Sequence, residues 1–166
     1  TYNKEQREIK EIRVGDYFIA RKPKDIKQSP VWVRSEMDKY DGVIQKCVST
    51  TRTETAGVIT ENTIAGDLSS WKFKEEWCEK VSPGDVMKTE RGNLFIFKGI
   101  DNNYIYDYAF CEIYARELFI NNNWGAASYK DAKVFHVSPE ESRPLFDALA
   151  KAGKKWNAEK MRVEDM

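Results

Sequence analysis

The stretch that decides the fold runs from Val31 to Val81. It opens with VWVRSEMDKYDGVIQKCVST (residues 31–50), crosses a polar loop, and closes with TIAGDLSSWKFKEEWCEKV (residues 63–81). Short apolar runs flank a turn at Met37–Gly42, and a later run ends in alternating aromatic residues: Trp71, Phe73 and Trp77. Branched and aromatic runs bounded by turn residues are typical of strands, and large aromatic side chains fill a small core. The pattern predicts a small antiparallel barrel.

The overall composition narrows the class of protein. The chain has 166 residues, of which 41% are hydrophobic and 13% aromatic, enough for two small cores. Basic and acidic residues both number 27, so the formal net charge is zero. A general polyanion binder has a basic excess, which this chain lacks. No apolar run approaches the roughly 20 residues that span a bilayer, and no secretory signal opens the sequence. We therefore expect a cytoplasmic protein.

Catalytic, metal and cofactor motifs are missing from the sequence. Cys47, Cys78 and Cys111 are widely spaced, and the single histidine, His136, completes no zinc set with them. We expect three reduced thiols in a cytosolic protein, with a reactive surface cysteine as the sharper alternative. Neither a nucleophile elbow nor a phosphate loop is present. The sequence predicts a protein that is not an enzyme, binds no metal and uses no cofactor, with a weak hydrolase as the outside option.

The order of the chain predicts three segments. Residues 1–13 are charged, and Ile9 and Ile12 have helical spacing, so this part is a helical or flexible segment. Residues 14–81 form a first β-rich unit. Residues 82–166 form a second, also β-rich.

Turn and strand signals divide the first unit further. Tyr17–Arg21 has the aromatic and branched content of a strand, and the two prolines of Lys22–Pro30 predict a loop. The Thr-rich, charged run Ser49–Ala56 is interpreted as a hairpin tip. Strand character resumes at Val58–Ile64.

Three motifs of the first unit form a recognisable set. They are Gly15-Asp16, Glu36-Met37-Asp38-Lys39-Tyr40-Asp41-Gly42 and Trp71-Lys72-Phe73-Lys74-Glu75-Glu76-Trp77. Together they resemble a small SH3-like barrel module of uncharacterised gut-bacterial phage and prophage proteins, and more distantly the mind-bomb-type SH3-like domains. The resemblance covers residues 12–82 and implies a binding or scaffolding role. The long hairpin at residues 49–66 departs from the family pattern.

The second unit begins with an echo of the first. Ser82-Pro83-Gly84-Asp85-Val86-Met87 repeats the pattern of Val14-Gly15-Asp16-Tyr17-Phe18, which indicates a second barrel-like unit. Later strands lead to a helix at residues 139–152, where Ser138-Pro139-Glu140-Glu141 has the form of a capping box. We expect Trp156 to pack back on this helix. The ending from Leu145 to Asn157 also resembles tails of the same phage proteins.

Candidate binding residues fall into three groups. The first is a basic group beside an exposed tryptophan: Arg21, Lys22, Lys24, Lys27 and Arg34 beside Trp32. The second is the aromatic Tyr40, which with Trp32 is expected to be partly exposed. The third is a tyrosine stripe on one strand: Tyr104, Tyr106 and Tyr108. Aromatic residues at strand spacing serve as core more often than as surface, so the core alternative stays open for the tyrosines.

We therefore expect a mainly β (β-rich α+β) fold, an SH3-like barrel followed by a second antiparallel β unit with one C-terminal helix. The expected function is a non-enzymatic binding module, encoded by a phage or mobile element and acting in the bacterial cytoplasm on a protein or peptide partner. Two alternatives remain at this point. One is nucleic-acid binding by the basic 21–34 loop, and the other is a structural component of the virion.

Overall fold

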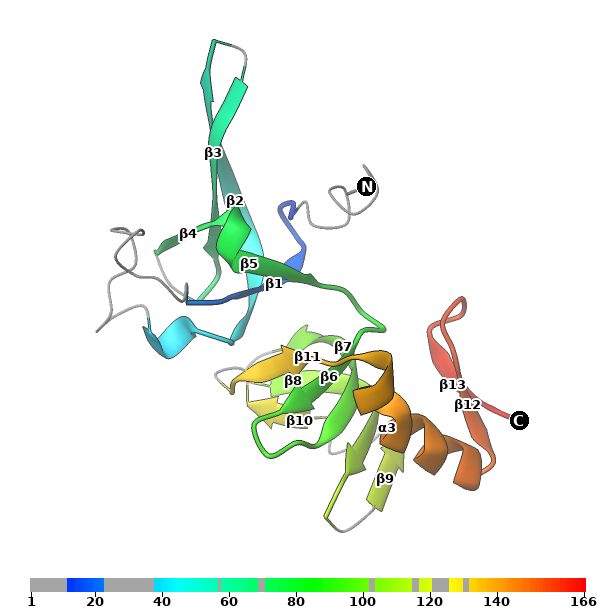
Figure 1. Cartoon of the computed structure of the whole chain (residues 1–166). Coiled ribbons are helices and arrows are strands. Elements are labelled where there is room, and N and C mark those ends of the chain that lie inside the picture. The colour runs from blue at the N-terminus through cyan, green and yellow to red at the C-terminus, as the bar shows by residue number, and fades with distance from the viewer. Residues whose placement is uncertain are drawn as a thin grey trace. The chain divides into compact units, whose positions relative to one another are not determined.

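The computed structural model describes residues 12–22, 38–56, 58–68, 71–101, 104–114, 117–120, 126–129 and 132–166 (Figure 1). The chain divides into two compact units, Thr1–Val81 and Ser82–Met166. The predicted fold class is confirmed: the sheets are antiparallel, and the described residues contain a single α-helix, near the C-terminus. Residues 1–11 of the predicted N-terminal segment lie outside the described residues.

The first unit is one five-stranded sheet with strand order β4-β3-β2-β1-β5. Its strands are β1 (Tyr17–Ala20), β2 (Ile44–Thr55), β3 (Val58–Gly66), β4 (Lys72–Lys74) and β5 (Cys78–Val81). A 3-10 turn, Glu75–Trp77, joins β4 to β5, and β5 returns to pair with the outer edge of β1. The first unit is therefore an antiparallel meander whose last strand returns to the first.

The core of the first unit follows from strand alternation. Phe18 and Ala20 on β1 point to one side, as residues two apart on a strand do, and both are fully buried. Their cluster includes Cys47, Ile64, Phe73 and Trp77. The rings of Phe18 and Phe73 lie with centroids 6.3 Å apart. Of the three aromatic residues that predicted a barrel, Phe73 and Trp77 are buried in this core, and Trp71 is partly buried against it.

The prediction of a hairpin tip at Ser49–Ala56 is wrong. Strand β2 continues to Thr55, and β3 resumes at Val58 after a turn in which Ala56 has a φ of 54°. Figure 1 shows this hairpin extending past the other strands of its sheet. The polarity of threonine suggests a loop, but its β-branched side chain favours strand backbone. In this run the β-branching decides the structure.

The second unit repeats the strand order of the first. Its six-stranded sheet has the order β10-β8-β7-β6-β11, with β9 also paired to β8. Its strands are β6 (Val86–Thr89), β7 (Leu94–Asp101), β8 (Tyr104–Glu112), β9 (Glu117–Ile120), β10 (Ala126–Tyr129) and β11 (Val134–His136). Strand β11 returns to pair with β6 as β5 returns to β1. Strands β6, β7, β8, β10 and β11 thus correspond to β1, β2, β3, β4 and β5.

The turns that open the two units have the same hydrogen bonds. In the first, Gly15 N donates to Cys47 O at 2.9 Å, and Cys47 N donates to Asp16 O at 2.7 Å. In the second, Gly84 N donates to Phe97 O and Phe97 N to Asp85 O, both at 2.8 Å.

The aspartates of these turns also correspond. Each carboxylate accepts the backbone N–H three residues earlier, Arg13 N to Asp16 and Ser82 N to Asp85, both at 2.9 Å. Each also faces a basic side chain on the returning strand: Lys80 at 3.4 Å from Asp16, and His136 at 3.5 Å from Asp85. The sequence echo therefore reflects a repeated structure.

A β-bulge follows at the same place in both units. Cys47 pairs with Gly66 and Ser49 with Ala65, which leaves Val48 as the extra residue. Phe97 pairs with Asp107 and Gly99 with Tyr106, which leaves Lys98 as the extra residue. A bulge interrupts the ladder and re-aims side chains, and its recurrence fixes the residue correspondence between the units. We call the strand order, opening turn and bulge the shared frame.

The second unit adds a covering layer to this frame. Helix α3 (Pro139–Lys151) and the hairpin of β12 (Lys154–Asn157) and β13 (Arg162–Asp165) follow β11. Leu145 and Leu149 of α3 pack on a buried cluster of the sheet, which includes Leu94, Ile96, Ala109 and Cys111. The predicted capping box is present: Ser138 Oγ accepts from Glu141 N at 3.1 Å. Trp156 packs against the same cluster, which contains the helix residues Leu145 and Leu149 as well as residues of the sheet.

Candidate binding surfaces

The described part of the basic group is neutralised by neighbouring carboxylates. Arg21 Nε lies 2.7 Å from Glu79 Oε2, and Lys22 Nζ lies 2.8 Å from Asp38 Oδ2. Asp41 adds a hydrogen bond from Lys22 N at 2.9 Å. The side chains of Arg21 and Lys22 are 25% and 26% exposed, and each charge is balanced by its own carboxylate partner. The remaining predicted members of this group, Trp32, Lys24, Lys27 and Arg34, lie outside the described residues.

Tyr40 lies against the first unit. It ends the 3-10 turn Asp38–Tyr40, is partly buried, and packs on the core cluster that contains Phe18 and Phe73. The Nζ of Lys39 is 5.2 Å from the Tyr40 ring centroid. The chain then turns back at Gly42, whose φ of 83° is accessible mainly to glycine. Tyr40 thus supports the barrel while keeping part of its surface exposed.

The tyrosine stripe on β8 is divided by the structure. Tyr108 packs against Trp156, with ring centroids 5.0 Å apart and ring planes tilted by 46°, and the Nζ of Lys98 lies 5.4 Å from the Tyr108 ring centroid. Tyr104 is 39% exposed and Tyr106 is partly exposed. Tyr106 is in register with Gly99 on β7, so the residue directly opposite it on that strand has no side chain. Tyr104 and Tyr106 therefore form the accessible part of the stripe, whereas Tyr108 is a packing residue.

An unusual carboxyl, that of Asp107, lies between Tyr106 and Tyr108 in sequence and alternates to the buried face of β8. Asp107 is 7% exposed, and its Oδ1 has no hydrogen-bond partner among the residues that the structure describes. Burial raises the pKa of Asp107 to about 7, against an opposing effect of the Lys98 charge. The corresponding residue of the first unit is Gly66, so the shared frame does not require a carboxyl here.

The thiols and the histidine do not form a reactive centre. Burial raises the pKa of Cys47, Cys78 and Cys111, which favours the inert thiol form. His136 faces Asp85 as part of the repeated turn. Among the residues that the structure describes, no group of three or more His, Cys, Asp or Glu side chains could hold a metal ion.

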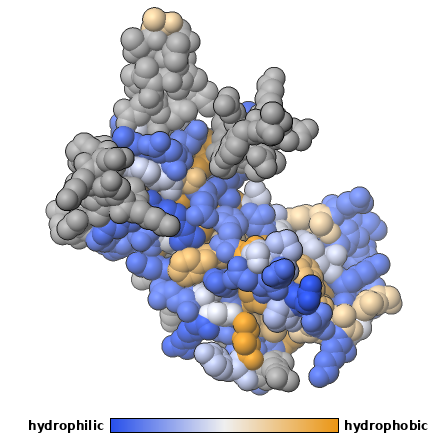
Figure 2. Space-filling view, viewed as in Figure 1, coloured by the Kyte–Doolittle hydropathy of each residue, from blue (hydrophilic) through white to orange (hydrophobic). Residues whose placement is uncertain are grey.

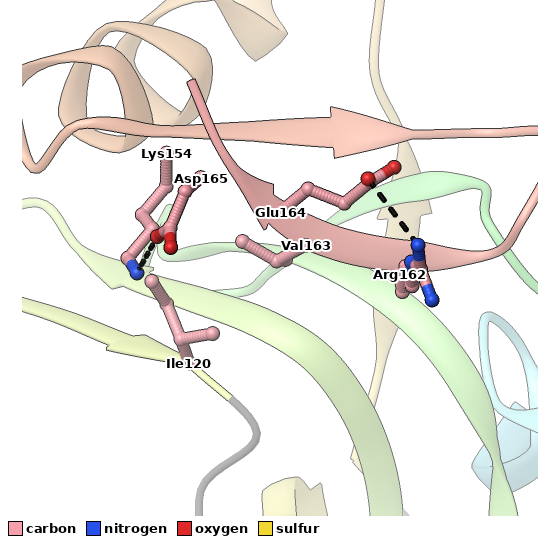
Figure 3. A pocket seen from close by; sticks show the side chains of 6 residues that line it. All are labelled: Ile120, Lys154, Arg162, Val163, Glu164 and Asp165. Atoms are coloured by element: carbon pink, nitrogen blue, oxygen red, sulfur yellow. Dashed lines mark hydrogen bonds and ion pairs between the residues drawn. The ribbon is translucent and has the colours of Figure 1, made fainter.

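A polar cleft of about 440 Å³ lies beside the C-terminal hairpin (Figure 3). It is lined by Ile120, Lys154, Arg162, Val163, Glu164 and Asp165. Its charges are matched within the cleft: Lys154 pairs with Asp165, and Arg162 lies 3.4 Å from Glu164. A hydrogen bond from Lys154 lowers the pKa of Asp165, and one from Asn157 lowers that of Glu164. An open cleft with satisfied charges offers little attraction to a small ligand.

The polar and apolar surfaces are finely mixed on the face drawn in Figure 2, where hydrophilic residues predominate. Exposed large apolar side chains do occur among the described residues. They are Val14, Val48, Tyr104, Ile113, Tyr114, Phe146 and Met166. Sequence reasoning missed Val48 and Asp107, because their special positions depend on a bulge register that no single strand reveals.

No protein-family model matches the chain, and no curated protein or solved structure matches it. Among the described residues, no helix is both long and apolar enough to cross a membrane. A functional proposal for this chain therefore rests on its described residues alone.

Proposed function

We propose that the chain is a non-enzymatic binding protein whose second unit contacts a protein or peptide partner through Tyr104 and Tyr106. One observation carries this proposal: the shared frame has Thr63 and Ala65 at the corresponding positions of the first unit. The frame therefore does not need aromatic residues there. Tyrosine offers a large, rigid contact area with a polar tip, which is why it is frequent at protein interfaces.

The surroundings of the two tyrosines favour protein over nucleic acid. Asp101 is exposed and lies in register with Tyr104, so the rim of the patch carries a negative charge. A phosphate backbone would be repelled there. A protein segment with apolar side chains and a basic residue is complementary to such a patch. The resemblance of residues 12–82 to phage-encoded SH3-like modules supports the same class of role, in the cytoplasm of a bacterial host.

The test is recovery of a partner from bacterial lysate by the tagged full chain, at low and high salt, with and without nuclease. The test variant is Tyr104→Ala/Tyr106→Ala, and the matched control is Tyr114→Ala, which removes a tyrosine that is 84% exposed in a turn. We expect a discrete protein that survives nuclease and high salt, is reduced at least tenfold by the double variant, and is unaffected by the control.

Other outcomes would contradict the proposal. Recovery that disappears with nuclease or salt would assign the chain to nucleic-acid binding instead. Recovery that the double variant leaves unchanged would remove the tyrosine patch from the interface. A stable symmetric oligomer that captures nothing would favour a virion component.

A further inference from the structure

The β2–β3 hairpin extends beyond the rest of its sheet as a two-stranded arm (Figure 1). On one side, the pairs between β1 and β2 end at Lys46, and the last bond from the opening turn reaches Cys47. On the other side, the pairs between β3 and β4 end at Thr63. We call Arg52–Thr55 and Val58–Asn62 the arm; within the described part of the chain, its two strands pair only with each other. A two-stranded hairpin alone is marginally stable in water, so a further strand along its edge would stabilise it.

The second unit has no such arm. Its corresponding hairpin, β7–β8, ends at the pair of Asp101 and Tyr104. Strand β10 accompanies β8 to that end, because Tyr129 pairs with Tyr104. The residues that lengthen the first hairpin are therefore an addition that the shared frame does not require.

The two edges of the arm differ in regularity. On β3, Thr60 is an extra residue between Ile59 and Glu61, the partners of two successive residues of β2. Such a bulge interrupts the row of backbone donors and acceptors, and it is one of the ways by which proteins protect an edge from pairing. On β2, every residue from Ser49 to Thr55 has a partner on β3, and this run contains no proline or lysine to protect it. The regular edge of β2 is therefore the one suited to accept another strand.

The sequence of this β2 edge is complementary to itself. The run Thr51-Arg52-Thr53-Glu54-Thr55 alternates threonine with charge, so Arg52 and Glu54 fall on one face of the strand. In an antiparallel pair of copies with a two-fold axis at Thr53, Arg52 of each copy is opposite Glu54 of the other. Threonine is then opposite threonine at the remaining positions. Opposite-charge pairs and threonine pairs across neighbouring strands both stabilise a sheet.

We propose that a second copy of this chain pairs with the arm along β2, antiparallel and about a two-fold axis at Thr53. The two arms then form one four-stranded sheet, and the contact closes at a dimer because both copies use the same edge. Backbone hydrogen bonds supply the association. The two pairs of Arg52 with Glu54 select the antiparallel direction, since a parallel pair in register would place like charges opposite each other. The dimer goes beyond the proposed function, which concerns a different unit of the chain.

Charge reversal tests the pairing, and sedimentation equilibrium of the full chain measures the dimerisation constant. Arg52→Glu or Glu54→Arg sets like charges opposite each other on both sides of the axis, and each should weaken dimerisation about tenfold. The double variant Arg52→Glu/Glu54→Arg restores opposite charges, so its constant should return to within about twofold of the parent value. Glu61→Arg on β3 is the matched control, because it changes the net charge as Glu54→Arg does and should have no effect.

Cross-linking tests the register independently. At the proposed axis, Thr53 is opposite its own copy, and directly opposite Cβ atoms lie about 4.5–5.5 Å apart, close to the reach of a disulfide. Thr53→Cys should therefore form an intermolecular disulfide with oxidised glutathione. Thr51→Cys, which would lie opposite Thr55 of the other copy, should not. The parent chain, whose three cysteines are free, gives the background.

Three results would overturn the inference. The first is a parent chain that is monomeric at every protein concentration. The second is a dimer that neither single charge reversal weakens, or that the double variant fails to restore in a chain whose circular dichroism shows it is folded. The third is cross-linking through Thr51→Cys as fast as through Thr53→Cys. Tyr104→Ala/Tyr106→Ala should leave the dimer intact, and the monomeric variants should still recover the protein partner, so either proposal can fail without the other.

Discussion

The first and second units have one frame and two different surfaces. Both have the same order of five strands, the same glycine–aspartate opening turn, and a bulge after the corresponding residue. The first unit lengthens its β2–β3 hairpin, whereas the second adds β9, α3 and a C-terminal hairpin. Features that both units share are the ones that the common fold requires. Features that only one unit has, such as Tyr104 and Tyr106, are where a function specific to this chain should be sought.

The largest expected losses of stability come from the buried core residues at corresponding positions of the two units. Phe18 and Met87 occupy corresponding sites, and both are fully buried. Phe18→Ala should lower the free energy of unfolding by about 3–5 kcal/mol and Met87→Ala by about 2–5 kcal/mol, because each leaves a cavity. Chemical denaturation measures both. A loss below about 1 kcal/mol at either site would show that the two positions are not equivalent core sites.

The second prediction concerns Asp107, which the first unit lacks. Its pKa is about 7 in the folded protein and near 4 when unfolded, so between these pH values the folded state holds the extra proton. Stability should therefore fall as pH rises from about 4 to 7, by up to about 4 kcal/mol. Asp107→Asn should flatten this dependence. Denaturation curves across that range measure it, and an unchanged slope in the variant would assign the dependence to other groups.

The third prediction concerns the packing of Gly66 against Gln45, next to the bulge of the first unit. A Cβ on Gly66 would lie 2.1 Å from Gln45 Oε1 and 2.8 Å from Gln45 Cβ, and Gln45 is fully buried. Gly66→Ala should cost about 2–3 kcal/mol through overpacking. Gln45→Ala in the same chain should recover part of that loss, because it removes the obstructing atoms. A double-mutant cycle with no coupling would refute the predicted contact.

The smallest expected effects are on the opening turns. Asp16→Ala and Asp85→Ala each remove a carboxylate that accepts a backbone N–H at 2.9 Å. Each should cost about 1 kcal/mol, since both groups are partly exposed and their ion pairs add little. Thermal unfolding of the two variants measures the losses. A clear inequality between them would indicate that only one turn depends on its aspartate.

Local signals in the sequence were sufficient for much of the fold. The Gly-Asp echo at Gly15 and Gly84 pointed to the repeated turn, because positive φ and an aspartate acceptor leave a short-range pattern. The capping box at Ser138 located the helix for the same reason. The threonine-rich part of β2 is a strand where its polarity predicts a hairpin tip, since polarity and β-propensity point to opposite structures there.

The candidate surfaces were less predictable. Whether a tyrosine on β8 is covered depends on the bulge and on Trp156, which lies 48 residues after Tyr108 in the chain. The pairing of Arg21 with Glu79 likewise joins distant segments, and it neutralises one member of the predicted basic group. Burial of Asp107 follows from register, which strand alternation alone does not fix.

Amide hydrogen exchange measured by NMR tests the shared frame most directly. The amides of Cys47 and Phe97 donate to the carbonyls of Asp16 and Asp85, and those of Gly15 and Gly84 donate back to Cys47 and Phe97. The account predicts that Cys47 and Phe97 are strongly protected, and that each glycine follows its partner. Protection of the set in one unit, with exchange at unfolded rates for the matching set in the other, would contradict the claim that the two units share a frame.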